Sequence, residues 1–282
     1  MLNSILLASI LFILSGCSSS QFSGETGNNP VVKPQGASPG EADYDASQAN
    51  QNDPDYDTAG SGPLGKGFNQ EEVTPGCSGN IAVALVVDTS ASMRWQPGVQ
   101  VPDAVKQACA NRSGLFLQNN NGNKMAAAKE SAGAFIKSLG SGDFVGLAKF
   151  SDSAIIVDQL TRNKKSVLAS LDTLAPERCT NVSDALEKGR EMLNAVSDSN
   201  LEKIIVVLSD GEPTVGGNPK ALAEDIKDLD GIKIAAVGYQ LNEPGRQVMS
   251  SLASSEDYYF DAPNTDELLN QFRRLARKVC EN

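Results

Sequence analysis

Three oxygen-bearing side chains, Asp88, Ser90 and Ser92, follow directly on an apolar run at residues 81–87. An uninterrupted run of this kind is typical of a strand buried on both faces of a parallel sheet. Because alternate residues of an extended segment point to one side, we expect the carboxylate and the two hydroxyls to converge just beyond the strand's carboxyl end. Ligands of open α/β sheets bind at that edge, and hard oxygen donors favour Mg²⁺ or Mn²⁺ over Zn²⁺ or Cu²⁺. The stretch therefore predicts a magnesium or manganese site.

The same spacing has a simpler interpretation, in which the three side chains only cap backbone amides at a strand-to-helix turn. Two later stretches favour the metal site. Residues 178–189 place Thr180 in a loop before an amphipathic helix, and residues 203–214 form a second apolar strand that ends at Asp210. Carboxyl ends of parallel strands meet at one edge of a sheet, so these residues can join the first three.

The order of these residues resembles the von Willebrand factor A domain with a complete metal-ion-dependent adhesion site. That family's pattern is D-x-S-x-S, then a Thr in a later loop, then an Asp after a further strand. The resemblance extends from about residue 77 to the C-terminus and includes the segments NKMAAAKESAGAFIKSL, FSDSAIIVDQLT and DYYFDAPNTDELLNQF. The five residues that match the pattern are Asp88, Ser90, Ser92, Thr180 and Asp210.

The resemblance also implies a mechanism for these residues. Ser90 and Ser92 are expected to bind the ion directly, and Thr180 to join them in the ligand-ready state. The two carboxylates, Asp88 and Asp210, are expected to act largely through water. The implied partner is a protein that offers an Asp or Glu side chain to the ion.

Residues 77–282 suit one domain with a sizeable core. Apolar strands alternate with helical patterns, which predicts an α/β fold: a doubly wound, mostly parallel central sheet with helices on both faces. A hairpin of residues 144–150 and 154–160 predicts one antiparallel strand at an edge. Further strands are expected at residues 232–238 and 258–260, and helices at 125–139, 182–196 and 265–279.

An insertion at residues 94–123 separates the candidate metal loop from the first helix, and it contains the only tryptophan, Trp95. A loop this long in a compact domain is usually functional or disordered. Since it starts directly after the metal loop, we expect it to lie on the rim of the site and to shape specificity. A surface loop without function is the alternative.

The cysteines predict both an exported protein and a position for the insertion. Setting Cys17 aside, an even number remains, and four cysteines allow three pairings. Cys77 precedes the first strand and Cys280 ends the last helix, and domain termini commonly lie close together, so we predict a bond between them. The remaining bond, Cys109 to Cys179, would hold the insertion against the residue before the candidate Thr ligand.

The first 17 residues contain an apolar run, residues 5–14, that is too short to span a bilayer and fits the core of a signal peptide. It ends in Leu-Ser-Gly-Cys, which resembles a bacterial lipobox with Cys17 as the lipidated residue. An ordinary secretory signal or a buried segment is the alternative. Ser18, in place of an acidic residue, resembles lipoproteins that reach the outer membrane of Gram-negative bacteria. We therefore expect an exported, lipid-anchored protein.

Residues 18–76 are rich in Ser, Gly, Asn, Gln, Asp and Pro, and they cannot bury enough apolar surface to offset the entropy of ordering. They are expected to form a disordered tether. This segment carries a net charge of −7 out of −11 for the whole chain. Such acidity argues against nucleic acid and anionic lipid surfaces as partners.

Residue types that the chain lacks narrow the function further. With no His, catalytic Ser-His-Asp and Cys-His arrangements and His-ligated zinc are excluded. An aspartyl phosphatase would need a second Asp where Ser90 stands, so we do not expect an enzyme, and a Mg²⁺-dependent hydrolase is a remote third hypothesis. Two main hypotheses remain. One is a metal-dependent protein-binding module on a lipid-anchored stalk, and the other is a structural component of an envelope, secretion or pilus assembly that does not depend on metal.

Overall fold

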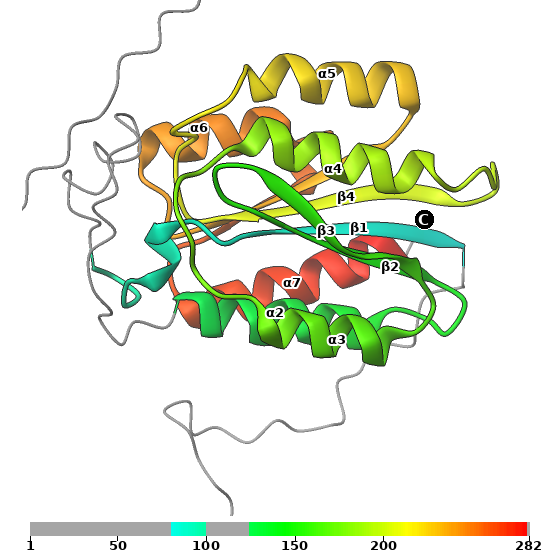
Figure 1. Ribbon diagram of the computed structural model, residues 1–282, viewed down its shortest axis with the longest axis horizontal. Coiled ribbons are helices and arrows are strands. Elements are labelled where there is room, and N and C mark those ends of the chain that lie inside the picture. The colour runs from blue at the N-terminus through cyan, green and yellow to red at the C-terminus, as the bar shows by residue number, and fades with distance from the viewer. Residues whose placement is uncertain (1–79, 100–123, 281–282) are drawn as a thin grey trace, which may run out of the picture. The chain divides into compact units, whose positions relative to one another are not determined.

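Strand β1 (Ile81–Asp88) lies in the middle of a six-stranded sheet with the order β3-β2-β1-β4-β5-β6 (Figure 1). The computed structural model describes residues 80–99 and 124–280. All of β1 is buried, as its uninterrupted apolar sequence predicts. The other strands are β2 (Phe144–Phe150), β3 (Ala154–Thr161), β4 (Glu202–Ser209), β5 (Lys233–Tyr239) and β6 (Tyr259–Ala262).

The sheet is parallel except at one edge. β1 pairs in parallel with β2 and β4, and β5 continues the parallel arrangement to β6. β3 pairs antiparallel with β2, with register irregularities near the start of β2. Asp88 is the register partner of Phe150, and Val87 that of Leu208, so β1, β2 and β4 end together. The predicted doubly wound fold with one antiparallel edge strand is confirmed.

Helices cover both faces of this sheet (Figure 1). One layer contains α2 (Lys124–Ser138), α3 (Lys164–Thr173) and α7 (Thr265–Cys280). The other layer contains α4 (Val182–Asn194), α5 (Pro219–Asp230) and α6 (Glu243–Leu252). Two short 3₁₀ helices, η3 (Ala91–Arg94) and η4 (Glu256–Tyr258), complete the described elements.

Asparagine side chains start five of the helices. Each accepts a backbone amide in the first turn of its helix: Asn163 in α3, Asn181 in α4, Asn218 in α5, Asn242 in α6 and Asn264 in α7. Such caps satisfy amides that have no partner within the helix. Three of these helices, α3, α5 and α6, are additional to the ones that the sequence analysis names.

The chain after β1 differs from the expectation of an extended segment. Ser90 is extended, but the backbone then turns into η3, where Met93 N donates to Ser90 O and Trp95 N to Ser92 O. The simple alternation of side chains along a strand therefore ends at Asp88. The turn, and not an extended backbone, determines where Ser92 points.

Several predicted features lie outside the described residues: the signal peptide at 1–17, the tether at 18–76 and most of the insertion at 94–123. Within residues 80–99 and 124–280, no helix combines the length and the apolar character needed to cross a bilayer.

Candidate functional site

Asp88 ends β1 with its side chain fully buried. Its Oδ1 accepts the amide of Ser90 at 2.6 Å, and its Oδ2 accepts the hydroxyl of Ser209 at 2.6 Å. Burial, and then the nearby charge of Asp210, raise the pKa of Asp88 to about 7. A buried carboxylate next to a second carboxylate is a position that favours a cation.

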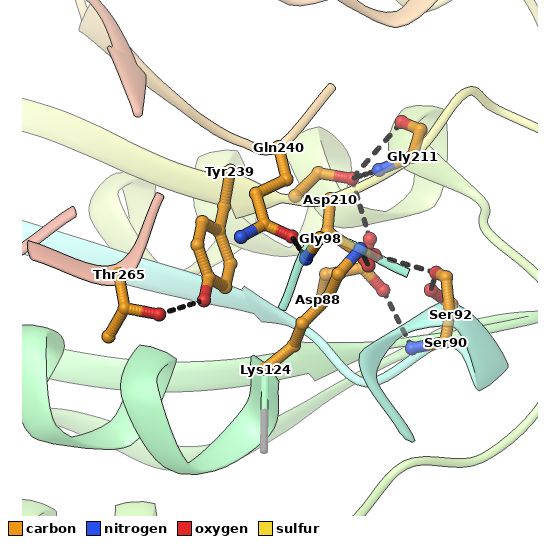
Figure 2. Close-up of polar contacts among 11 residues, drawn as sticks. Asp88, Ser90, Ser92, Gly98, Lys124, Asp210, Gly211, Tyr239, Gln240 and Thr265 are labelled. Carbon is orange, nitrogen blue, oxygen red and sulfur yellow. Dashed lines mark hydrogen bonds and ion pairs between the residues drawn. The ribbon is translucent and has the colours of Figure 1, made fainter. Parts of the chain in front are cut away.

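The two serines connect this carboxylate to the neighbouring strand. The Ser90 and Ser92 hydroxyls lie 2.8 Å apart, and Ser92 Oγ donates to Asp210 Oδ1 at 2.6 Å (Figure 2). Asp210 follows the last residue of β4. Four of the five predicted site residues, Asp88, Ser90, Ser92 and Asp210, therefore form one connected group at the carboxyl ends of β1 and β4.

The loop that contains Thr180 is held beside this group by backbone hydrogen bonds. Its amide donates to the hydroxyl of Thr214 at 2.9 Å, and its carbonyl accepts the amide of Thr214 at 2.9 Å. Two residues earlier, the carbonyl of Arg178 accepts the amide of Ala91 at 2.7 Å, and this bond ties the loop to the start of η3. Thr180 is buried. Among the described contacts its hydroxyl does not join the hydrogen-bonded group, so its role as a ligand stays a prediction.

Glu177 connects the same loop to the end of β2 and to the residue after β1. Glu177 accepts hydrogen bonds from Lys149 and from Ser151 Oγ, the second at 2.8 Å, and its amide donates to the carbonyl of Thr89. The amide and the hydroxyl of Thr89 both donate to Phe150 O, at 2.8 and 2.9 Å. The loop before Thr180, the end of β2 and the residue after β1 are thus connected by main-chain bonds.

Lys124 is a site residue that the sequence analysis does not identify. It is the first residue of α2, its side chain is 4% exposed, and its Nζ lies 2.8 Å from Asp210 Oδ2. Figure 2 shows the side chain reaching from α2 to the carboxylates. Ser209, the donor to Asp88, is the other residue that was missed. Neither has a distinctive sequence signal, because single Lys and Ser residues are common at helix starts and strand ends.

The two ends of the insertion lie beside the site. The amide of Lys124 donates to the carbonyl of Trp95 at 3.3 Å, and the amide of Gly98 donates to Gln240 Oε1 at 2.8 Å. Trp95 is half-buried. Gln240, at the end of β5, has a positive φ of 53°. The predicted effect of the insertion on specificity concerns residues that are not described, and it stays a prediction.

The structure describes two of the cysteines, Cys179 and Cys280, and each belongs to a different predicted disulfide. Neither Cys179 nor Cys280 is a free thiol. Their predicted partners, Cys109 and Cys77, are outside the described residues, so the pairing itself stays a prediction.

The donor set fits a small, hard cation. Within residues 80–99 and 124–280, no three His, Cys, Asp or Glu side chains gather in a way that could hold a metal. The candidate ligands are instead hydroxyls supported by two carboxylates. Hydroxyl and carboxylate oxygens are hard donors, the type that Mg²⁺ and Mn²⁺ prefer, so the residues present fit such an ion in their chemistry.

Residues 82–274 match the von Willebrand factor type A domain. The uncharacterized protein YwmC of Bacillus subtilis strain 168 is 31% identical over 91 residues, which cover 32% of this chain and 39% of YwmC. Two solved structures share the fold. Proximal thread matrix protein 1 of the mussel byssus, with zinc in its MIDAS motif, has a TM-score of 0.56 at 19% identity, over 73% of this chain and 47% of that chain. The pilus adhesin SpaC of Lactobacillus rhamnosus GG has a TM-score of 0.53 at 21% identity, over 72% of this chain and 31% of that chain. The aligned region spans less than half of each of these three proteins.

Proposed function

Because the chain belongs to the von Willebrand factor type A domain family, we propose that it is a metal-dependent protein-binding module that holds Mg²⁺ or Mn²⁺ and captures a carboxylate of a partner protein. The observation that carries this proposal is the connected group of oxygens at the carboxyl ends of β1 and β4. It links the Asp88 carboxylate through Ser90 and Ser92 to Asp210. The proposed role is binding and not catalysis.

The residues divide into two groups by chemistry. Ser90, Ser92 and Thr180 would hold the ion through hydroxyl oxygens, and Asp88 and Asp210 would act through water. When bound, the ion supplies a Lewis-acidic centre with open coordination positions. Hydroxyls are neutral donors and leave most of its charge uncompensated. An Asp or Glu side chain of a partner is therefore the ligand that this set favours.

Titration calorimetry of the full chain in detergent with Mn²⁺ tests the metal site. We expect a single site in the wild type, and a loss of affinity of at least about tenfold in Ser92→Ala, because that variant removes one hydroxyl that bonds to Asp210. The matched control is Ser250→Ala, which changes an exposed serine on α6. Wild-type protein that binds no Mn²⁺ at millimolar concentration would contradict the proposal.

Acetate serves as the probe for carboxylate capture. We expect Mn²⁺-loaded protein to bind acetate and protein in EDTA to bind none, as measured by the relaxation of water protons around Mn²⁺. Acetate binding that is the same in EDTA would show that the ion does not take the carboxylate.

The proposed location is the cell envelope. The chain would be exported and anchored through a lipid on Cys17 to the outer membrane of a Gram-negative cell. Residues 18–76 would be the tether between the lipid and the domain. This location rests on the lipobox-like sequence and on the predicted disulfides.

A structural role in an envelope, secretion or pilus assembly is the second candidate. The Lys124–Asp210 ion pair favours it, because it neutralises one carboxylate of the site without any metal. Binding of a purified assembly partner that survives both EDTA and Asp88→Ala would support this role over the metal-dependent one.

A further inference from the structure

Lys124 is a buried lysine whose ammonium group contacts a buried carboxylate. Its side chain is 4% exposed and that of Asp210 is fully buried. Lysine is almost never fully buried unless it is paired. The residue also starts α2, whose first turn contains no acidic side chain, and a cation at a helix N-terminus opposes the helix dipole. Helix stability therefore does not explain this lysine, and the carboxylates do.

The charges of the site are unequal on its two sides. Asp210 has Ser92 and Lys124 as donors, the second of them charged. Asp88 has a hydroxyl and an amide as donors, both neutral. Two carboxylates and one ammonium leave the site with one net negative charge when both carboxylates are ionised. A divalent ion added to this arrangement gives one net positive charge, whereas without the lysine the loaded site would be neutral.

We propose that Lys124 is a tethered counter-cation of the metal site, which weakens divalent-ion binding and strengthens the capture of an anionic ligand once the ion is bound. This inference rests on the proposed function and adds a specificity-determining residue to it. The lysine and the ion repel each other across Asp210, so the ion binds less tightly than the oxygen ligands alone would allow. The positive charge that remains attracts a carboxylate.

The position of the lysine connects this effect to the insertion. The amide of Lys124 donates to Trp95 O, so the ammonium is carried by the residue at which the chain returns from the insertion. The charge beside Asp210 is therefore carried by the first residue of α2, and that residue is bonded to the described part of the loop after β1.

Charge-changing variants of the full chain test the proposal by Mn²⁺ titration calorimetry. Lys124→Met removes the charge and keeps the apolar stem, and we expect Mn²⁺ affinity to rise at least about tenfold, given Coulomb energies at an effective dielectric of about 20. Lys124→Arg keeps the charge and should stay within about threefold of wild type. Lys188→Met is the matched control, because Lys188 pairs with Glu191 on the exposed face of α4.

Acetate affinity of the Mn²⁺-loaded protein gives a second readout. If Lys124 had only a structural role, its loss would weaken Mn²⁺ and acetate binding together and would not change the two affinities in opposite directions. We expect it to fall at least about tenfold in Lys124→Met, while Mn²⁺ affinity rises. If Lys124→Met does not fold without metal, Lys124→Gln, which retains a donor for Asp210, takes its place.

The outcomes separate this inference from the proposed function. Equal or weaker Mn²⁺ binding by the uncharged variants, with normal binding by the wild type, would overturn the role of Lys124 and leave the metal site standing. Absence of Mn²⁺ binding in the wild type and in all variants would overturn the proposed function itself.

Discussion

The hydroxyl of Ser209 donates to Asp88 Oδ2 at 2.6 Å and so joins the carboxyl ends of β4 and β1. Both residues are fully buried. A buried carboxylate loses its hydration, and each hydrogen bond that it accepts offsets part of that loss. The pair therefore fixes the orientation of Asp88 before any ligand is present.

Ser209→Ala should lower the free energy of unfolding by about 1–3 kcal/mol, because it removes one of the donors to a buried carboxylate. Urea denaturation of the full chain in EDTA measures this effect. Ser250→Ala, at an exposed position on α6, should stay within about 0.5 kcal/mol of wild type. The same loss in both variants would mean that the bond to Asp88 contributes nothing.

Two glycines should respond to alanine with opposite signs. At Gly146 in β2, an added Cβ would lie 2.6 Å from Met192 Sδ and 3.1 Å from the carbonyl oxygen of Asp158. This overpacking should lower the free energy of unfolding by about 1–3 kcal/mol.

At Gly133 in α2, the nearest atom to an added Cβ, Leu168 Cδ2, would be 3.6 Å away. Gly133→Ala should therefore stabilise the protein by up to about 1 kcal/mol. Thermal unfolding measures both. A Gly146→Ala variant as stable as wild type would show that Met192, on α4, moves aside at little cost.

Gly216→Ala should weaken both the fold and the metal site. Gly216 has a φ of +100°, and its Cβ would lie 2.1 Å from Asn181 Oδ1, the atom that caps α4. Backbone strain should cost about 1–3 kcal/mol. The displaced Asn181 follows Thr180, so Mn²⁺ affinity should fall as well. Gly231→Ala is the control: it has a φ of +64°, with no atom within 4 Å of an added Cβ. It should cost stability and leave Mn²⁺ binding unchanged.

Peptide mapping without reduction should recover Cys77 bonded to Cys280 and Cys109 bonded to Cys179. The first bond follows from the usual proximity of domain termini. The second would hold the insertion beside Thr180. A peptide that joins Cys109 to Cys77 or to Cys280 would show that the insertion is placed differently.

Cys17→Ser should release the protein from the membrane fraction, because the lipobox-like sequence would then lack the residue that carries the lipid. Phase separation in detergent measures the change, with Ser250→Ala, at an exposed position on α6, as a control that keeps Cys17. A Cys17→Ser variant that still enters the detergent phase would refute the lipid anchor.

The parts of the site that lie on strand ends are predictable from the sequence. Buried parallel strands are apolar runs, and their carboxyl ends meet at one edge, so the positions of Asp88 and Asp210 follow from two such runs. The approach of Ser92 to Asp210 depends on η3, a turn that alternation along a strand does not describe. Lys124 is beyond prediction for a different reason. A lysine at the start of a helical pattern is normally exposed, and only the approach of the first residue of α2 to the residue after β4 makes it a partner of Asp210.

Some elements of the fold can be predicted from the spacing of apolar residues, and others cannot. The hairpin of β2 and β3 and the helices α2, α4 and α7 follow from their apolar spacing. Helices α3, α5 and α6 are short and mostly polar, with few buried residues each. Their signal lies in the capping residues, Asn163, Asn218 and Asn242, and in the prolines that follow two of them.

The central position of β1 has a mechanical consequence. The strand enters the sheet at Ile81 and ends at Asp88, roughly 23 Å further on for a rise of about 3.3 Å per residue. Both of its neighbours, β2 and β4, run parallel to it. A pull between the chain before Ile81 and a ligand held at Asp88 acts along the strand and loads the hydrogen bonds on both of its sides in shear. Those bonds must fail together, whereas a hairpin pulled at its open end unzips one bond at a time. Under the proposed function, a partner bound at the end of this strand would therefore be held against a pulling force.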